Sequence, residues 1–122
     1  MDHDHDANDN DMGVDMLSSR VYMLVSMIPK GRICTYADIA RAIGRPRAYR
    51  LVGRILNRNP NPVIVPCHRV VKSNGSVGGY MHGHDVKRAL LESEGVHVDC
   101  KGRIIGFDSV RFKFDLGSEA DK

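Results

Sequence analysis

The sequence lacks the features that mark membrane and secreted proteins. It contains no apolar run of about 18 residues or more, the length that a membrane-spanning helix needs. Its N-terminus is acidic, whereas a secretory signal starts with basic residues and continues with an apolar stretch. The sequence therefore predicts a protein without a membrane span that works inside the cell.

Cysteine is also scarce. The chain has three cysteines, Cys34, Cys67 and Cys100, and none of them forms a CxxC pair. An odd number without paired spacing argues against a disulfide framework and against a zinc cage. We expect three free thiols, each of which is open to three interpretations: core packing, chance exposure at the surface, or chemical reactivity.

Length and composition predict a single folded domain with an acidic arm. The 122 residues, 42% of them hydrophobic, suffice for one modest core. Residues 1–16 are poor in apolar side chains and rich in Asp, Asn and His, so they cannot bury enough surface to offset the entropy of ordering. We expect a disordered arm over residues 1–16, a domain over residues 17–116 and a flexible tail over residues 117–122. His3 and His5 lie in the arm without fixed geometry, and we predict no metal site.

Basic charge is concentrated in the middle of the chain. The net charge is only +3, but the arm holds six aspartates and no Lys or Arg, so residues 17–122 carry +9. Between Lys30 and Lys72 there are ten Lys or Arg residues against one acid, Asp38. Such clustering is typical of proteins that bind the phosphate backbone of nucleic acids. The alternative is a solvated cationic surface with no such partner.

Apolar spacing predicts three helices in the first half of the domain. The first begins near Leu17 and ends at Pro29 and Gly31, with apolar positions at Leu17, Val21, Leu24, Val25 and Ile28. Thr35 is a suitable N-cap for a second helix over residues 36–43, which Gly44 ends. A third follows over residues 47–57 and carries several arginines. Two short helices joined by a glycine-containing turn indicate a helix-turn-helix, with an ordinary helical hairpin as the alternative.

The second half predicts shorter elements. Residues 63–65 have the pattern of a buried strand, and residues 84–94 that of a helix capped by Gly95. The inward positions predicted for this helix are Val86, Ala89, Leu90 and Leu91. The residues after it suggest a small hairpin or wing. The fold class is thus mainly α with short β elements, in a winged helix-turn-helix arrangement.

Cys67 is the cysteine with the most suggestive neighbours. His68 follows it, and arginines are frequent nearby. A thiol becomes a nucleophile when a nearby base or a positive potential favours its thiolate, and both are available here. A Cys-His pair is weak support by itself, because adjacent side chains on an extended backbone point to opposite faces. A buried structural cysteine is the alternative.

A longer stretch around Cys67 carries a resemblance. The segment NPNPVIVPCHRVV is preceded by IPKGRICTYADIARAIGRPRAYRLVGRIL and followed by NGSVGGYMHGHDVKRALLESEG. From Ile28 to Gly95 the sequence resembles the C-terminal domain of the O6-alkylguanine-DNA alkyltransferases, also called methylated-DNA–protein-cysteine methyltransferases. The resemblance implies a DNA-binding domain that carries its own sacrificial nucleophile.

The resemblance also assigns catalytic positions. Cys67 matches the alkyl acceptor of the family, and Asn59 matches the asparagine of the hinge between recognition helix and active-site loop. His68 and Glu94 match the hydrogen-bonded pair that withdraws the thiol proton through a water. From the residues alone, Asn59 also fits simple turn chemistry and Glu94 an ordinary carboxylate at a helix end.

Further positions match DNA contacts and the base pocket. Arg50 matches the arginine that fills the space left by the flipped base, and Tyr36 matches the tyrosine that helps rotate the nucleotide. Base flipping is required because the O6 substituent is out of reach while the base is stacked. The DNA-binding set is Thr35, Tyr36, Arg47, Arg50, Arg54 and Arg69. The pocket set is Tyr36, Val70, Gly78, Tyr80 and Lys87. As alternatives, Arg50 and Arg54 fit plain phosphate contacts, and Tyr36 and Tyr80 fit packing.

The function implied is irreversible transfer of an alkyl group from O6 of guanine in double-stranded DNA to Cys67. No cofactor, membrane or obligate protein partner is expected, and the protein should be a monomer. A second hypothesis is a lesion sensor that recruits excision-repair proteins, because the short layout and the tail EGVHVDCKGRI resemble the alkyltransferase-like proteins, which lack the nucleophile. The thiol at position 67 favours the enzyme. A third hypothesis, a winged-helix transcription regulator, does not explain the segment PCHRV.

Overall fold

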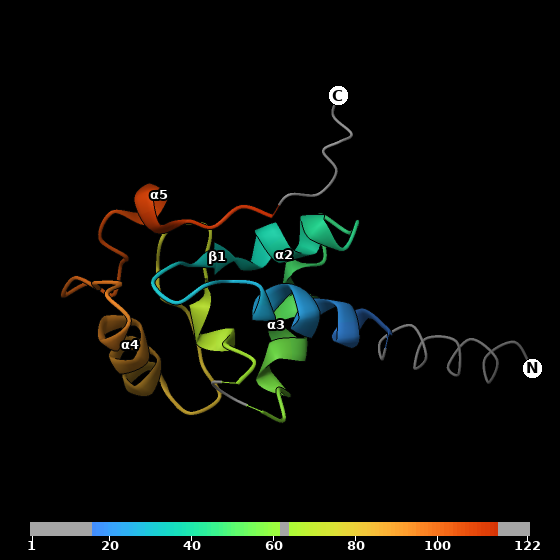
Figure 1. Ribbon diagram of the computed structural model, residues 1–122, viewed down its shortest axis with the longest axis horizontal. Helices are drawn as coiled ribbons and strands as arrows, with labels where there is room; N and C mark the ends of the chain where they lie inside the picture. Colours follow the sequence, from blue (N-terminus) through green and yellow to red (C-terminus); the bar gives the residue numbers. More distant parts are fainter. Residues whose placement is uncertain (1–15, 62–63, 115–122) are drawn as a thin grey trace, which may run out of the picture.

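The computed structural model describes residues 16–61 and 64–114. Residues 1–15 of the expected arm and the expected tail over residues 117–122 lie outside the described residues, whereas Met16 is helical. The elements, in chain order, are a helix over residues 16–26, β1 (Cys34–Thr35), α2 (Tyr36–Ala42), α3 (Tyr49–Asn57), the 3-10 turn η1 (Cys67–Arg69), β2 (Val70–Val71), α4 (His84–Ser93) and α5 (Phe107–Val110) (Figure 1). The predicted fold class, mainly helical with short β elements, is confirmed.

Two hydrophobic clusters lie on either side of a two-stranded parallel sheet. β1 pairs with β2 in the register Cys34 to Val70 and Thr35 to Val71. Successive side chains of a strand point to opposite faces. Accordingly, Cys34 and Val70 pack in the cluster with the first three helices, whereas Ile33 and Val71 pack in the cluster with α4. In Figure 1 the first three helices form one end of the molecule and α4 the other.

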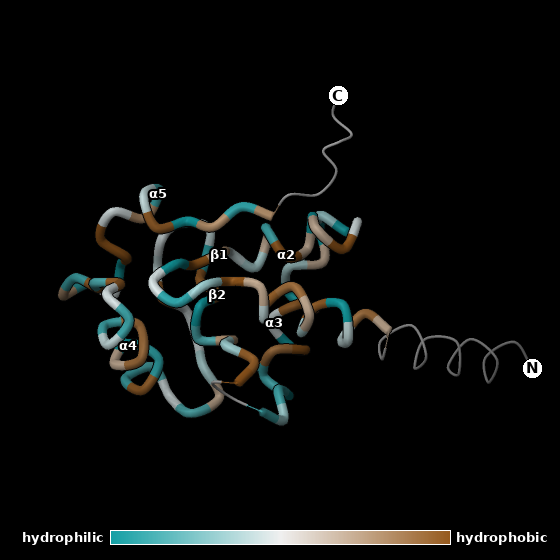
Figure 2. The backbone as a smooth tube through the Cα atoms, viewed as in Figure 1, coloured by the Kyte–Doolittle hydropathy of each residue, from teal (hydrophilic) through white to brown (hydrophobic). Residues whose placement is uncertain are grey.

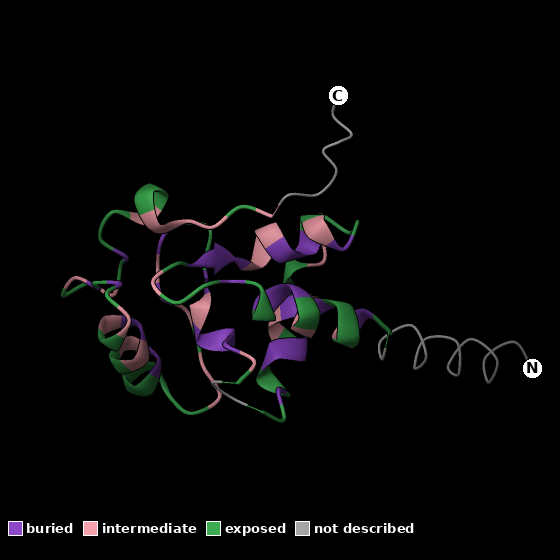
Figure 3. Ribbon diagram, viewed as in Figure 1, coloured by how far each residue is buried: buried purple, intermediate pink, exposed green. Residues whose placement is uncertain are grey.

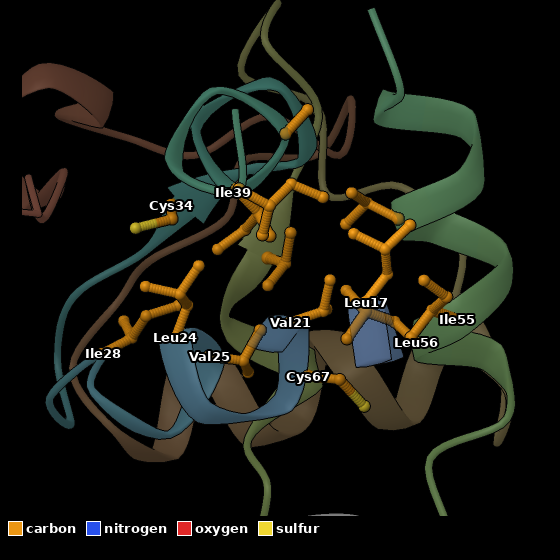
Figure 4. Packing of buried hydrophobic residues seen from close by; sticks show 14 residues of the cluster. Leu17, Val21, Leu24, Val25, Ile28, Cys34, Ile39, Ile55, Leu56 and Cys67 are labelled. Carbon is orange, nitrogen blue, oxygen red and sulfur yellow. The ribbon is translucent and has the colours of Figure 1, made fainter. Parts of the chain in front are cut away.

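The first helix buries the face that its spacing predicts. Leu17, Val21, Leu24 and Val25 are all buried, and Ile28 follows them in the turn after the helix. Figure 4 shows these side chains converging with those of α2 and α3. Full burial of such a side chain contributes about 1.5–3 kcal/mol. This helix therefore anchors the segment that leads into β1.

A capping box fixes the start of α2. The Thr35 hydroxyl accepts a hydrogen bond from the Asp38 amide at 2.9 Å, and the Asp38 carboxylate accepts one from the Thr35 amide at 3.0 Å. The same carboxylate accepts a fork of two bonds from Arg111, at 3.1 and 2.7 Å. Gly44, with φ of +79°, follows the helix in the left-handed conformation expected of a C-terminal glycine. Thr35 thus acts as the predicted cap.

We expect Asp38→Ala to lower the free energy of unfolding by about 2 kcal/mol, because it removes a cap and leaves Arg111 without its partner. Burial alone would raise the pKa of Asp38, but hydrogen bonds from Arg111 and Thr35 lower it below its usual value. A carboxyl with a lowered folded-state pKa contributes stability above its unfolded pKa, and this stability is lost as the pH falls through the folded pKa. Urea unfolding of both proteins should show a difference that shrinks on acidification, and a difference independent of pH would contradict this role.

Helix α4 buries only part of the predicted face: of the four inward positions predicted, Leu91 is buried and Leu90 is half-buried. Lys87 and Leu91 are buried, whereas Val86 is 44% exposed and Ala89 is also exposed. The reason is that the Lys87 ammonium finds backbone acceptors in the interior, which hydrophobic periodicity does not detect. In Figure 2 hydrophilic and hydrophobic residues alternate around α4, as expected for an amphipathic surface helix.

The predicted strand over residues 63–65 is wrong in its described part. Ile64 is 80% exposed in a turn, and the strand lies further on, at Val70–Val71. The Asn59 side chain holds this segment as a turn by hydrogen bonds that an apolar pattern cannot show. The wing after α4 exists as antiparallel bridges, Val98 to Ile104 and Ser76 to Arg103, while helix α5 was not predicted.

No helix within the described ranges has the length and apolar character needed to cross a bilayer.

Candidate functional site

Cys67 lies at the edge of the larger cluster, on the turn η1. Its exposed fraction is 4%. Figure 3 colours this turn as buried, and in Figure 4 the sulfur points away from Val21 and Leu56. The backbone at Cys67 is a 3-10 turn, closed by hydrogen bonds from the Arg69 amide to the Pro66 carbonyl at 2.9 Å and from the Val70 amide to the Cys67 carbonyl. The thiol therefore lies on the turn that leads directly into the buried strand β2.

Asn59 ties the hinge segment to this thiol. Its side-chain amide donates to the Val65 carbonyl at 2.8 Å and to the Cys67 sulfur at 3.3 Å. Its side-chain oxygen accepts from the Asn61 amide at 2.9 Å. The contacts with the Val65 carbonyl and the Asn61 amide agree on which end of the side chain is nitrogen. Asn59 thus makes the turn contacts that the sequence left as an alternative, and it also donates to the sulfur.

His68 and Glu94 are brought together from distant parts of the chain. His68 Nε2 lies 3.0 Å from Glu94 Oε2, and the imidazole is fully buried. Burial opposes ionisation of Glu94, but hydrogen bonds from Arg69 and His68 lower its pKa, so it is a carboxylate. Burial is also the main reason that the pKa of His68 is lowered. The neutral imidazole then keeps its hydrogen on Nε2 and has a free lone pair on Nδ1, which has no hydrogen-bond partner among the described residues.

Arg69 occupies a different place from that expected of a DNA contact. Its guanidinium donates to both oxygens of Glu94, at 2.8 and 2.7 Å, and to the carbonyl of Ile28 at 2.7 Å. The side chain is 14% exposed. The structure therefore groups Arg69 with His68 and Glu94 and not with the exposed arginines.

Lys87 is a buried amine beneath the predicted pocket. Its ammonium donates to the carbonyls of Val70 at 2.7 Å and Gly79 at 3.0 Å, and to the hydroxyl of Tyr36 at 3.3 Å. Burial lowers the pKa of Lys87 to about 7, while the charge of Cys67 acts in the opposite direction. Burial, helped by Cys67, raises the pKa of Tyr36 to about 12. The Tyr36 hydroxyl therefore keeps its proton over the physiological range.

We expect the Lys87 amine to lose its proton near neutral pH, because burial lowers its pKa to about 7. Carbon-detected NMR of labelled lysine side chains during a pH titration measures this value. A Lys87 signal that titrates at the ordinary lysine value of about 10.4 would contradict this assignment.

An open cavity of about 910 Å³ lies beside these residues. Three of the predicted residues line it, namely Tyr36, Arg50 and Tyr80. The buried Tyr80 hydroxyl has no hydrogen-bond partner within the part of the chain that the structure describes. The cavity thus provides an aromatic and partly polar recess, and Cys67 is not among the residues that line it.

Gly78 lies close to two residues that line this recess, Lys72 and Tyr36. Its φ is +81°, a conformation that other residues rarely adopt. A Cβ atom at this position would lie 3.4 Å from Cγ of Lys72 and 3.5 Å from the Tyr36 hydroxyl. A larger residue would therefore be strained and would press on Tyr36.

Helix α3 carries its arginines on the surface. Arg50 and Arg54 are exposed, and Arg47 is exposed in the turn before the helix. The opposite face buries Val52, Ile55 and Leu56 in the core (Figure 3). These arginines are free to contact a phosphate backbone, as expected of a recognition helix. Thr35 differs from them because it is fully buried and its hydroxyl caps α2, and its contact with DNA stays a prediction.

Several cavity residues were not predicted. They are Ala37, Tyr49, Gly53, Asn57, Lys72, Ser73, Asn74, Gly79 and Met81. The sequence Ser73-Asn74-Gly75 is typical of a turn, and its position just after the Cys67 segment is the feature that could have placed it at the site. Within residues 16–61 and 64–114, no group of three His, Cys, Asp or Glu side chains is arranged to hold a metal ion.

Comparison with known proteins identifies the domain. Residues 16–96 match the family described as 6-O-methylguanine DNA methyltransferase, DNA binding domain. The chain belongs to this family. The match runs from the first helix through α4. It therefore includes Cys67, the His68–Glu94 pair and the arginine-bearing helix α3 of this chain.

Individual relatives fall into two groups. A methylated-DNA–protein-cysteine methyltransferase of Methanosarcina barkeri is 49% identical over 82 residues, which are 67% of this chain and 51% of that protein. Mycobacterium tuberculosis OGT, solved in complex with DNA, is 45% identical with a TM-score of 0.63, and the alignment covers 64% of this chain and 48% of that one. The S. pombe protein Atl1, solved with damaged DNA containing O6-carboxymethylguanine, is 29% identical with a TM-score of 0.71, covering 82% of this chain and 97% of that one.

The methyltransferase domain thus spans about half the length of the curated relatives that it matches, and nearly the whole of Atl1.

Proposed function

We propose that this protein repairs DNA by transferring an alkyl group from O6 of guanine to Cys67. The observation that carries the proposal is the buried thiol of Cys67, which accepts a hydrogen bond from Asn59 and is followed by a histidine paired to Glu94. The sulfur attacks the alkyl carbon, and the bond between that carbon and O6 breaks. Guanine keeps the electron pair and takes up a proton, while the thiol gives one up. No cofactor is consumed, and each protein molecule acts once because the thioether is stable.

His68 is the general base of this proposal. The free lone pair of its Nδ1 accepts the thiol proton through a water, while Glu94 holds Nε2–H and so fixes the tautomer. The Asn59 amide donates a hydrogen bond to the Cys67 sulfur at 3.3 Å and so helps to hold the nucleophile in position.

The flipped guanine occupies the cavity beside Tyr36 and Tyr80. Tyr36 serves as a hydrogen-bond donor to the base, since its raised pKa keeps the hydroxyl protonated. Lys87 holds that hydroxyl and the backbone of Val70 and Gly79, so it keeps the recess in shape. Arg50 lines the cavity from α3, where it is placed to enter the base stack, and Arg47 and Arg54 contact the phosphate backbone.

The working unit of this proposal is the predicted domain over residues 17–116, acting as a monomer on double-stranded DNA. Its partners are DNA strands that contain O6-alkylguanine.

A lesion sensor is the second candidate, favoured by the alignment with nearly the whole of Atl1. A sensor and an enzyme share the flipped base and the arginine-bearing helix. They differ in whether the O6-alkylguanine remains in the DNA after the protein has bound it. The thiol at position 67 favours the enzyme, because a sensor has no use for an activated nucleophile.

Nucleoside analysis separates the two candidates. The protein is incubated with a double-stranded oligonucleotide that contains one O6-methylguanine, and the DNA is then digested and quantified by chromatography. We expect O6-methyldeoxyguanosine to disappear with a plateau at one lesion per protein molecule, and Cys67→Ser to leave it intact. Tight binding by the unaltered protein with full recovery of the lesion would establish the sensor instead.

A further inference from the structure

We propose that Arg69 is a positioning residue that keeps His68 neutral and correctly oriented for its role as a base. This inference rests on the proposed function of His68. It gives Arg69 a role inside the protein, whereas the resemblance assigned this arginine to the contacts with DNA.

The contacts of Arg69 fix the Glu94 carboxylate in one orientation. Nε and Nη2 donate to the two carboxylate oxygens at 2.8 and 2.7 Å, and Nη1 donates to the Ile28 carbonyl at 2.7 Å. A forked arginine–carboxylate pair of this kind restricts both distance and plane. The Arg69 and Glu94 side chains are 14% and 8% exposed, so solvent screens the pair only weakly.

A glycine allows the turn after the first helix to approach Glu94 closely. Gly31 has a φ of +86°, and a Cβ there would lie 3.3 Å from the Glu94 carbonyl oxygen. This turn therefore packs directly against the end of α4. The Glu94 side chain is held by Arg69, which also donates to the Ile28 carbonyl in the same turn region.

The consequence for His68 is electrostatic. Burial disfavours the imidazolium form of His68 most strongly. The hydrogen bond and the charge of Glu94 favour the imidazolium, whereas the charges of Arg69 and Lys87 disfavour it. Without Arg69, Glu94 would be an uncompensated anion beside the imidazole. His68 would then take up a proton on Nδ1 more readily, and a protonated Nδ1 has no lone pair to accept the thiol proton.

The test compares the unaltered protein with Arg69→Met and Arg69→Lys. The pKa of His68 is followed by NMR of the imidazole without DNA, and the methyl-transfer rate is measured as a function of pH. Arg111→Met is the matched control, because Arg111 makes the same kind of fork on Asp38 away from His68.

We expect Arg69→Met to raise the pKa of His68 and to move the acid limb of the rate profile upward with it. The rate should fall about tenfold near pH 6 and recover to within about threefold of the unaltered protein near pH 8.5. Arg69→Lys, which keeps the charge but not the fork, should lie between the two. Arg111→Met should leave the pKa of His68 unchanged.

An unchanged His68 pKa in either Arg69 variant that folds would overturn the proposal, as would a loss of rate that is the same at every pH. A uniform loss together with weaker DNA affinity would assign Arg69 to the DNA interface. The imidazole titration needs no DNA or activity, so it tests the role of Arg69 even if the protein proves to be a sensor. A shifted His68 pKa in a protein that transfers no alkyl group would reject the proposed function and retain the positioning role.

Discussion

Replacing His68 with alanine is expected to lower the rate of methyl transfer to Cys67 by about a hundredfold to ten-thousandfold, the range that a positioned general base contributes. His68 offers the free Nδ1 lone pair, and its other nitrogen is held by Glu94 at 3.0 Å. The measurement is a single-turnover time course with saturating O6-methylguanine DNA, so that changes in affinity do not enter the rate.

His97→Ala is the matched control for this prediction. His97 pairs with Glu92 at 2.9 Å, but it is exposed and lies on the surface beyond α4. Its removal should leave the rate unchanged. A His68→Ala protein that stays folded and transfers methyl within about threefold of the normal rate would remove His68 from the chemistry.

Asn59→Ala should damage both stability and reaction. It leaves the Val65 carbonyl and the Asn61 amide without their partner and removes the hydrogen bond to the Cys67 sulfur. A fully buried polar group that loses its partner costs about 1–3 kcal/mol, and these two groups are partly buried, so we expect the free energy of unfolding to drop by about 2 kcal/mol. The methyl-transfer rate of the folded variant should fall about tenfold to a hundredfold, because the thiolate loses a donor worth about 1.5–3 kcal/mol.

Urea unfolding and single-turnover kinetics measure the two effects separately. Asn61→Ala serves as the control, since only the backbone of Asn61 contacts Asn59 and its side chain is exposed. Loss of stability in Asn59→Ala with a normal rate would make Asn59 a turn residue alone and would contradict its contact with the thiolate.

The helices were predictable because local rules decide them. The spacing from Leu17 to Val25 matches a buried helical face, and Thr35 caps α2 as its residue type suggests. Helix α4 shows where such rules fail, because a buried lysine replaces Val86 on the inner face. Its burial depends on carbonyls of Val70 and Gly79, which only the tertiary structure brings to it.

The candidate site was predictable in its residues but not in its connections. The resemblance picked out Cys67, His68 and Glu94, and the structure brings His68 and Glu94 into contact. The resemblance gave no indication that the Arg69 side chain turns inward to Glu94, because an arginine in a basic segment is equally consistent with a DNA contact. The turn at Cys67 was also not predicted, since it is closed by backbone hydrogen bonds to Pro66 and Cys67 that an apolar pattern does not show.

The most direct test of the account is intact-protein mass spectrometry after incubation with DNA containing one O6-methylguanine, followed by peptide mapping of the three cysteines. The account predicts a gain of one methyl group per molecule, located on Cys67 and absent from Cys34 and Cys100, and no gain in Cys67→Ser. A protein that binds the lesion and keeps its original mass, or one that carries the methyl group on another cysteine, would contradict it.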